Sequence, residues 1–330
     1  MLTPKENYLR MIKGEIPEYV PSMYDNRRGL YVNDYLTPQS APNGPITTAL
    51  GIRYVGAPAE MMYGALPDPE RPVLKDITQW RDWVKLPDLS DVDFEKYFAE
   101  KIKNIDREKQ YIAITNGDYF LTLVSIMGFE NAFVAMHKNP DEVIEMLKYI
   151  STYYIDMMKK EIYYIKPDTF SLMDDDSAFQ NPFFNLRTYK KIFKPLHKLH
   201  CDIALESGLP IERHDCGHCE VFIPDWLEMG ICAWNPAQTS NDLAAIKKNY
   251  GDRLAICGGW HSPDWSNDCD ENELRDALVE YTDMLAPGGG FAFMAGISGK
   301  MNDPKTKEKQ EFIKNFYFDY VHDYYKTHKQ

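Results

Sequence analysis

The alternation of short apolar runs with helical stretches constrains the fold of this 330-residue chain more than any other feature. Between the runs, apolar residues recur every three or four positions, which indicates amphipathic helices. Two such stretches cover residues 143–157 and 274–285. The runs themselves are Tyr111–Thr115, Thr169–Met173, Pro210–Arg213, Ile231–Trp234, Leu254–Ile256 and Gly290–Met294. Strands that alternate with helices in this way predict parallel βα units.

The N-terminal part of the chain supplies the remaining units. Thr3, Pro4 and Glu6 are typical of a helix start, with a cap, a proline in the first turn and a capping-box glutamate, and Gly14 ends the helix. Residues 19–24 indicate a short strand, and we expect one more strand in the segment that follows. About eight units predict an α/β protein with a (β/α)8 TIM barrel. A doubly wound open sheet is the alternative, although no G-x-G-x-x-G or Walker sequence follows a strand.

The segment from about residue 27 to residue 93 shows no sustained period and is rich in proline, glycine and tyrosine. Long irregular segments in compact proteins usually have a functional role, so we expect a lid-like insertion near the barrel mouth. The segment contains no flexible linker of glycine and serine. We therefore expect residues 1–330 to form a single domain.

Charge and hydropathy exclude several classes of partner. The chain carries 37 basic and 50 acidic side chains and has no dense stripe of lysine and arginine. Because this balance repels a phosphate backbone, we expect no nucleic-acid partner. No apolar run approaches the roughly 18 residues of a membrane span, and MLTPKENYLRM has no secretory-signal character. We expect no membrane association, a cytoplasmic location and reduced thiols for the six cysteines.

Polar, thiol and glycine residues follow directly after the predicted strands, where a barrel carries its chemistry. These residues are Asp25, Asn26, Asn116, Asp118, Asp174, Asp175, Asp176, His214, Asp215, Cys216, Asn235, Cys257, Trp260, His261 and Gly296. A purely structural barrel end has no need of an imidazole and two thiols at this level.

The segment HDCGHCE, from His214 to Glu220, is the sharpest local signal. His214 and Cys216 are two residues apart, so on an extended strand end their side chains point to the same side. Imidazole nitrogen and thiolate sulfur suit Zn²⁺, and a catalytic zinc takes three protein ligands and keeps one position open. Cys257, at the end of a later strand, is the best third ligand. The alternatives are buried cysteines beside a hydrogen-bonded histidine, or use of Cys216 and Cys219 as a redox or structural-zinc CxxC pair.

Other strand-end residues suggest catalytic and substrate contacts. Asp174 is the acidic residue nearest its strand end, and it either orients substrate or caps the following helix. For Asn116 and Asn235 we weigh substrate contact against helix capping. The predicted substrate-binding residues are Asp25, Asn26, Trp260 and His261. The remaining histidines, among them His197 and His200, are expected at the surface.

Several blocks of the sequence resemble the uroporphyrinogen decarboxylase-like superfamily. They are TPKENYLRMIKGEIPEYVP at the N-terminus, the Asp-rich strand end, the H-x-C-G strand, YGDRLAICGG, and PGGGFAF near the C-terminus. The resemblance spans residues 3–299 and implies a (β/α)8 barrel. One branch of the superfamily comprises metal-free decarboxylases, which hold their substrate with basic residues from an arginine-bearing N-terminal loop. The pattern of that loop is not recognisable in PSMYDNRRGLYVND, which argues against uroporphyrinogen as the substrate.

The second branch comprises the cobalamin-dependent methyltransferases, which hold zinc with an H-x-C pair and a further cysteine. His214 and Cys216 match that pair. The further cysteine of the coenzyme M-type members would fall in AGISG, where Ile297 stands instead, so the resemblance leaves Cys257 or Glu220 as the third ligand. The sequence is most similar to the methyltransferase component of anaerobic demethylase systems.

This resemblance implies a zinc enzyme that moves a methyl group from a small methylated substrate to the corrinoid of a partner protein. A methoxylated aromatic is the expected donor, with methylamines and thioethers as alternatives, and dimeric family members imply a homodimer. The expected roles are zinc binding by His214, Cys216 and Cys257, and substrate orientation by Asp174 and Asn235. The alternatives are a metal-free decarboxylase acting on a different acid and a non-catalytic binding protein.

Overall fold

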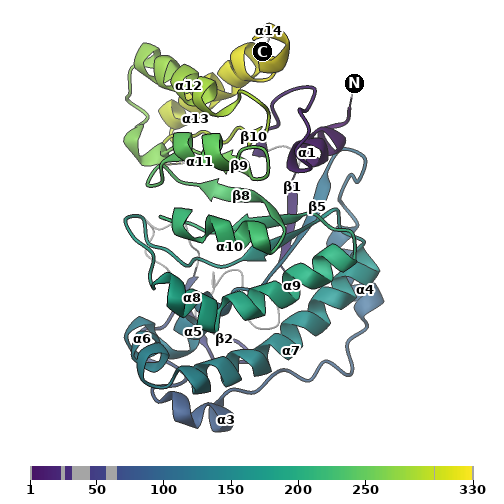
Figure 1. The fold of residues 1–330 in the computed structure, drawn as a ribbon, viewed down its shortest axis with the longest axis vertical. Helices are drawn as coiled ribbons and strands as arrows, with labels where there is room; N and C mark the ends of the chain where they lie inside the picture. Colours follow the sequence, from purple (N-terminus) through teal and green to yellow (C-terminus); the bar gives the residue numbers. More distant parts are fainter. Residues whose placement is uncertain (1, 24–26, 32–44, 57–64, 301, 329–330) are drawn as a thin grey trace.

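The main sheet of the protein is parallel and curled (Figure 1). The computed structural model describes residues 2–23, 27–31, 45–56, 65–300 and 302–328. Within these ranges the sheet has seven strands, in the order β1-β5-β6-β7-β8-β9-β10. They are β1 (Arg27–Tyr31), β5 (Tyr111–Asn116), β6 (Thr169–Met173), β7 (Ile211–His214), β8 (Ile231–Ala237), β9 (Ala255–Gly258) and β10 (Phe291–Ala292).

The strand order follows the chain order without a reversal, and every pair of neighbours is parallel. A doubly wound sheet reverses its order at a switch point, so the open-sheet alternative does not fit. The segment before β1 also reaches the other edge of the sheet, because Ser22 forms a parallel bridge with Phe293. The predicted α/β class is confirmed, and the curled parallel sheet is consistent with a TIM-type architecture. Among the described residues this sheet has seven strands, so a complete eight-stranded barrel is not shown.

Several helices begin at residues whose side chains cap the first turn. Thr3 caps the first helix with a complete capping box, as predicted, and Asp270 caps the helix that covers residues 271–285. The helices are α1 (Pro4–Ile12), α3 (Trp80–Trp83), α4 (Phe94–Ile102), α5 (Tyr119–Met127), α6 (Phe129–Lys138), α7 (Pro140–Ile165), α8 (Leu186–Ile192), α9 (Lys194–Glu206), α10 (Ile223–Glu228), α11 (Leu243–Tyr250), α12 (Glu271–Leu285), α13 (Pro304–Phe316) and α14 (Tyr324–Thr327). Figure 1 shows α7 and α9 lying next to each other and both chain termini at one end of the molecule.

The irregular N-terminal segment contains more regular structure than its sequence indicates. Besides β1, it forms a small antiparallel sheet of β2 (Ile46–Thr47), β3 (Arg53–Gly56) and β4 (Ala65–Pro67). Ile52 is buried and belongs to the main apolar core. This part of the segment is therefore packed onto the body of the protein, and the predicted lid role stays a prediction.

Alternate residues of the strands face two different apolar clusters, as the pleat of a β-strand requires. One set, which includes Ile112, Phe170 and Trp234, packs with the helices in the large core. The opposite set joins three residues of α1 in a second cluster: Tyr8, Met11, Ile12, Tyr111, Ala113, Ala233, Ala255, Cys257 and Ala292. Helix α1 thus fills the N-terminal end of the sheet's inner face, and the other end is left for polar side chains.

No single helix in the described ranges has both the length and the apolar character of a membrane span. Helices α5 and α6 meet that criterion only as a pair, and they are bent by 111° relative to each other. Most residues of α5 are buried in the protein.

Two histidines of α9 were expected at the surface, and this expectation is wrong. His197 and His200 are both fully buried. The Tyr119 hydroxyl lies 2.7 Å from His200 Nε2, and the ring of Phe170 stacks on the imidazole of His200. Burial, together with the neighbouring His197, lowers the pKa of His200 to about 3.

This lowered pKa predicts a specific acid sensitivity. Below the unfolded-state pKa of about 6.5, the unfolded chain gains a proton at His200 that the folded chain does not gain until about pH 3, so acid favours unfolding. We expect His200→Gln, whose amide still reaches the Tyr119 hydroxyl, to become more stable relative to the wild type as the pH falls from about 7 to about 4. Urea unfolding of both proteins across this range measures the difference. A difference independent of pH would contradict the assignment.

Candidate metal centre

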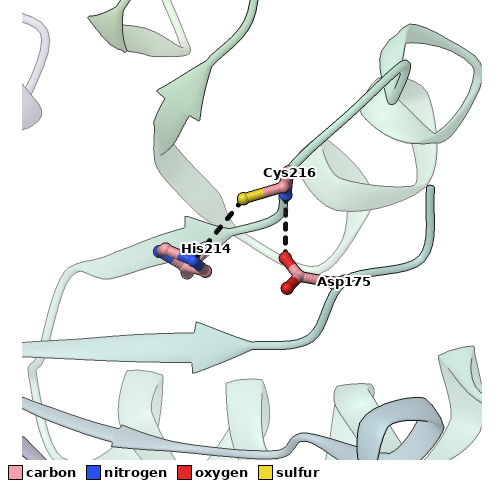
Figure 2. Close-up of side chains that lie close together, drawn as sticks. All are labelled: Asp175, His214 and Cys216. Atoms are coloured by element: carbon pink, nitrogen blue, oxygen red, sulfur yellow. Dashed lines mark hydrogen bonds between the residues drawn. The ribbon is translucent and has the colours of Figure 1, made fainter. Parts of the chain in front are cut away.

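Three potential metal ligands meet where β6 and β7 end (Figure 2). His214 is the last residue of β7, Cys216 lies just beyond it, and Asp175 lies just beyond β6. One ligand atom of each residue lies within 4.8 Å of the others, and His214 Nε2 is 4.0 Å from Cys216 Sγ. All three residues are partly exposed, so a small molecule can reach them. Figure 2 shows the Cys216 thiol directed at the imidazole and Asp175 approaching from the neighbouring strand.

Backbone hydrogen bonds continue the β6–β7 pairing into the two loops. The Asp174 N–H donates to the His214 carbonyl at 3.1 Å, and the Cys216 N–H donates to Asp175 Oδ1 at 3.0 Å. The Asp176 N–H donates to Asp215 Oδ1 at 2.9 Å. These bonds fix the position of each ligand-bearing residue relative to the facing loop.

Gly217 allows the two loops to approach closely. Its φ is +88°, a left-handed conformation that costs glycine little. A Cβ at this position would lie 2.4 Å from the Ala178 carbonyl oxygen and 2.7 Å from that of Ser177. Any larger residue would therefore push the loop after β6, and Asp175 with it, away from Cys216.

A fully buried ion cluster lies behind the ligands. On β7, Arg213 points to the helix side and donates to Asp176 Oδ2 at 2.6 Å and to Asp215 Oδ2 at 2.5 Å. Burial raises the pKa of Asp176, whereas the charge of Arg213, which pairs with the ionised carboxylate, lowers it. Through these hydrogen bonds, the guanidinium links the loop after β6 to the loop after β7.

The protonation state of the imidazole suits metal binding, whereas the thiol must first lose its proton. Burial lowers the pKa of His214, although the charge of Asp175 acts in the opposite direction, and a neutral imidazole is the form that binds a metal. Burial raises the pKa of the Cys216 thiol, and the charge of Asp175 adds to this rise. The metal-free thiol is therefore protonated, and binding of a cation would release that proton.

The donor set matches zinc. Zinc takes imidazole nitrogen, thiolate sulfur and carboxylate oxygen at about 2.0–2.3 Å, which places tetrahedral ligands roughly 3.5 Å apart. Separations of 4.0 Å and up to 4.8 Å require only small side-chain movements to reach this spacing. Three ligands leave one position open, as in catalytic zinc sites.

Cys257, the predicted third ligand, lies outside the group of three potential ligands. Its thiol is fully buried in the second apolar cluster, 3.7 Å from the Tyr8 hydroxyl. Burial raises the pKa of Cys257 to about 12. The structure brings His214 and Cys216 together with Asp175 and does not bring Cys257 into this group. Glu220, the other candidate, accepts the Asp242 N–H and lies outside the group as well.

The contacts of Asp174 and Asn116 are those of structural residues. Asp174 is buried and accepts the N–H groups of Phe120 and Leu121, at the N-terminus of α5, where a helix favours negative charge. Asn116 donates to the Tyr154 carbonyl and accepts the Gly117 N–H. The catalytic roles expected for these two residues stay predictions without a contact that supports them.

The predicted substrate-binding residues divide into two groups. Asp25 and Asn26 lie outside the described residues. The Trp260 indole donates to the Gly296 carbonyl at 2.6 Å and stacks on Trp265. His261 pairs with Asp264 at 2.9 Å through Nδ1. Trp260 and His261 follow β9, two strands away from the ligand-bearing end of β7.

The site also includes residues that sequence reasoning did not select. Asp175 was named only as part of an acidic run in which Asp174 was preferred. Glu212 and Arg27 form a 3.3 Å ion pair, and Glu212 also contacts the amide of Asn235. A glutamate inside a predicted strand, two residues before His214 and therefore on the same side of the strand, was the signal that could have identified this pair.

Comparisons with known proteins agree with this architecture. A family model described as "Uroporphyrinogen decarboxylase (URO-D)" matches residues 49–299. Among solved structures, the chain is similar to a methyltransferase from Methanosarcina mazei, with 13% identity and a TM-score of 0.60. This similarity covers 96% of this chain and 100% of that one. No curated protein matches the chain.

The geometry predicts which cysteine matters for metal binding. We expect Cys216→Ala and Asp175→Asn to lose more zinc affinity than the roughly 10- to 100-fold that follows loss of an outer-shell partner, because each removes a ligand. Cys257→Ala should bind zinc like the wild type, because its thiol lies in the α1 cluster. Zinc titration against a chromophoric chelator measures all three variants.

Cys219→Ala is the matched control for the loss of a thiol. Cys219 is buried three residues beyond Cys216 and donates to the Cys216 carbonyl, and it is not part of the ligand group. Loss of zinc from Cys257→Ala together with retention in Asp175→Asn would contradict the proposed ligand set.

Proposed function

Because the chain belongs to the uroporphyrinogen decarboxylase family, we propose that it is a zinc-dependent methyltransferase of that family. In this proposal the methyl group moves from a small methylated donor to the cobalt of a corrinoid bound to a partner protein. The group formed by Asp175, His214 and Cys216 at the carboxyl ends of the parallel strands is the observation that carries it. In folds of this type the active site lies at these strand ends.

A thiol, an imidazole and a carboxylate converge at this site. A metal-free decarboxylase has no use for such a combination, whereas a zinc enzyme can use all three groups as ligands. The similarity in fold to the methyltransferase from Methanosarcina mazei also supports the proposal of a methyltransferase. The metal-free decarboxylase remains the alternative that the experiment below is designed to detect.

Each ligand residue has a defined task in this proposal. Bound zinc would supply a Lewis acid that stabilises the negative charge left on the donor heteroatom when the methyl group departs. Neutral His214 presents a nitrogen lone pair, while Cys216 and Asp175 contribute one negative charge each. Two anionic ligands would balance the charge of Zn²⁺, so the loaded centre would carry no net charge, which suits an uncharged donor such as an ether.

Aromatic side chains at the strand ends support an aromatic donor. Phe179, in the loop after β6, lies with its ring centre 5.1 Å from that of His261, in the loop after β9. Strands β7 and β8, which carry His214 and Asn235, lie between these two strands in the sheet. The contact therefore joins the loop after β6 to the loop after β9, on either side of the strand that carries His214. The Phe179 side chain is 45% exposed, and it offers an aromatic surface to a methoxylated ring.

Metal removal tests the proposal directly. We expect protein purified without oxygen to methylate reduced cobalamin with a methoxylated aromatic donor, to lose this activity on chelation and to regain it with Zn²⁺. The reason is that the methyl ether is inert without Lewis-acid assistance. Absorbance of the corrinoid follows the transfer, and Cys219→Ala serves as the active control.

The opposite outcomes are equally specific. Release of carbon dioxide from an acid substrate at a rate unchanged by chelation would favour the decarboxylase. Methyl transfer at full rate by Cys216→Ala would contradict the zinc mechanism. Methylamine and thioether donors, offered in parallel, define the class of methyl donor.

A further inference from the structure

Arg27, Glu212 and Asn235 connect the first strand of the sheet to the candidate metal ligand His214 through direct hydrogen bonds. We infer that this relay fixes the proton of His214 on Nδ1 and so leaves Nε2 free for the metal. The three residues are positioning residues that act through His214. The inference rests on the proposed metal function, since it concerns the same site.

Glu212 is the central residue of the relay, because it contacts both Arg27 and Asn235. It lies on β7 two residues before His214, so both side chains point to the inner face of the sheet. Its side chain is fully buried, and its carboxylate accepts hydrogen bonds from the Thr169 hydroxyl at 2.7 Å and from Arg27 Nε at 3.3 Å. Arg27 balances the charge that burial would otherwise leave uncompensated.

The carboxylate determines how the Asn235 amide is oriented. Asn235 Nδ2 lies 3.4 Å from Glu212 Oε2. A carboxylate can only accept hydrogen bonds and the amide NH₂ group can only donate them, so the NH₂ group must face Glu212. The amide oxygen of Asn235 must then face the other way, toward His214.

The amide oxygen in turn determines the tautomer of His214. Asn235 Oδ1 lies 3.0 Å from His214 Nδ1, and an amide oxygen can only accept. Nδ1 therefore carries the proton of the neutral ring. The lone pair is on Nε2, the atom that lies 4.0 Å from Cys216 Sγ. Partners of this kind on the far nitrogen are what orient metal-binding histidines and raise their basicity.

The relay draws on four strands of the curled sheet. Arg27 belongs to β1, Thr169 to β6, Glu212 to β7 and Asn235 to β8. None of these side chains is among the three ligands, and no step of the proposed methyl transfer needs them to touch the donor. Burying an ion pair costs desolvation free energy. A role of this pair in orienting a metal ligand would explain why the protein contains it.

Two measurements on the purified full-length chain test the relay. Nitrogen-15 NMR of the metal-free, histidine-labelled protein reports which ring nitrogen of His214 carries the proton, with His214→Gln used to assign the signals. Competition with a chromophoric chelator gives the dissociation constant for Zn²⁺. In the wild type we expect the proton on Nδ1.

Asn235→Leu removes the acceptor with little change in volume. We expect the proton to shift toward Nε2 and zinc binding to weaken about 10- to 100-fold. Glu212→Met, which frees the Asn235 amide to rotate, should change both measurements in the same direction. If Glu212→Met fails to fold because Arg27 loses its partner, Asn235→Leu alone still decides the question.

Glu212→Gln is the conservative variant that should preserve the relay. The Arg27 guanidinium can only donate, so the amide oxygen of the new glutamine must occupy the position that now faces both Arg27 and Asn235. The orientation of Asn235 and the tautomer of His214 are then retained, and we expect zinc affinity within a few-fold of the wild type. Asn7→Leu is the control for loss of a buried amide, because Asn7 is a fully buried asparagine of α1 whose amide bonds to the backbone of residues 18 and 19.

The outcomes separate this inference from the proposed function. A wild type that binds zinc but carries the proton on Nε2 would overturn the relay and leave the metal centre intact. Wild-type zinc affinity in Asn235→Leu would overturn it as well. A wild type with the proton on Nδ1 and no affinity for zinc would confirm the tautomer assignment and contradict the proposed function.

Discussion

The buried ion cluster of Arg213 with Asp176 and Asp215 is the interaction on which the candidate site depends. One guanidinium bonds to the loop after β6 and to the loop after β7, and all three side chains are fully buried. Removal of one partner of such a cluster typically costs about 3–5 kcal/mol, because a charge is left uncompensated. Asp175 and Cys216 are each adjacent to a carboxylate of the cluster. The cluster therefore determines the distance between two of the three metal ligands.

The alternation of side chains along β7 separates structural from chemical roles. Ile211 and Arg213 face the helices, whereas Glu212 and His214 face the inner side of the sheet. On that inner side, α1 and the alanine-rich strand starts form an apolar layer below the polar residues. A chain that places acids and thiols above such a layer can hold a cation in a partly enclosed space, which is the setting that Lewis-acid catalysis requires.

Sequence reasoning located the six regular strands of residues 111–294 to within a few residues, because each is a short apolar run bounded by turn residues. It also selected His214 and Cys216, whose spacing along one strand is a local property. It could not select Asp175 over Cys257, since that choice depends on the depth of each strand end in the curled sheet. His197 and His200 were misplaced because the polarity of a side chain does not show that a helix face is buried. Arg27, in an irregular stretch, gave no signal.

The central claim is that one cysteine, one histidine and one aspartate bind the metal. X-ray absorption at the zinc edge of the purified protein tests it most directly. The claim predicts one sulfur ligand at about 2.3 Å and the remaining ligands, nitrogen or oxygen, at about 2.0–2.2 Å. Two sulfur ligands would contradict it, because among the described residues Cys216 is the one cysteine grouped with His214 and Asp175.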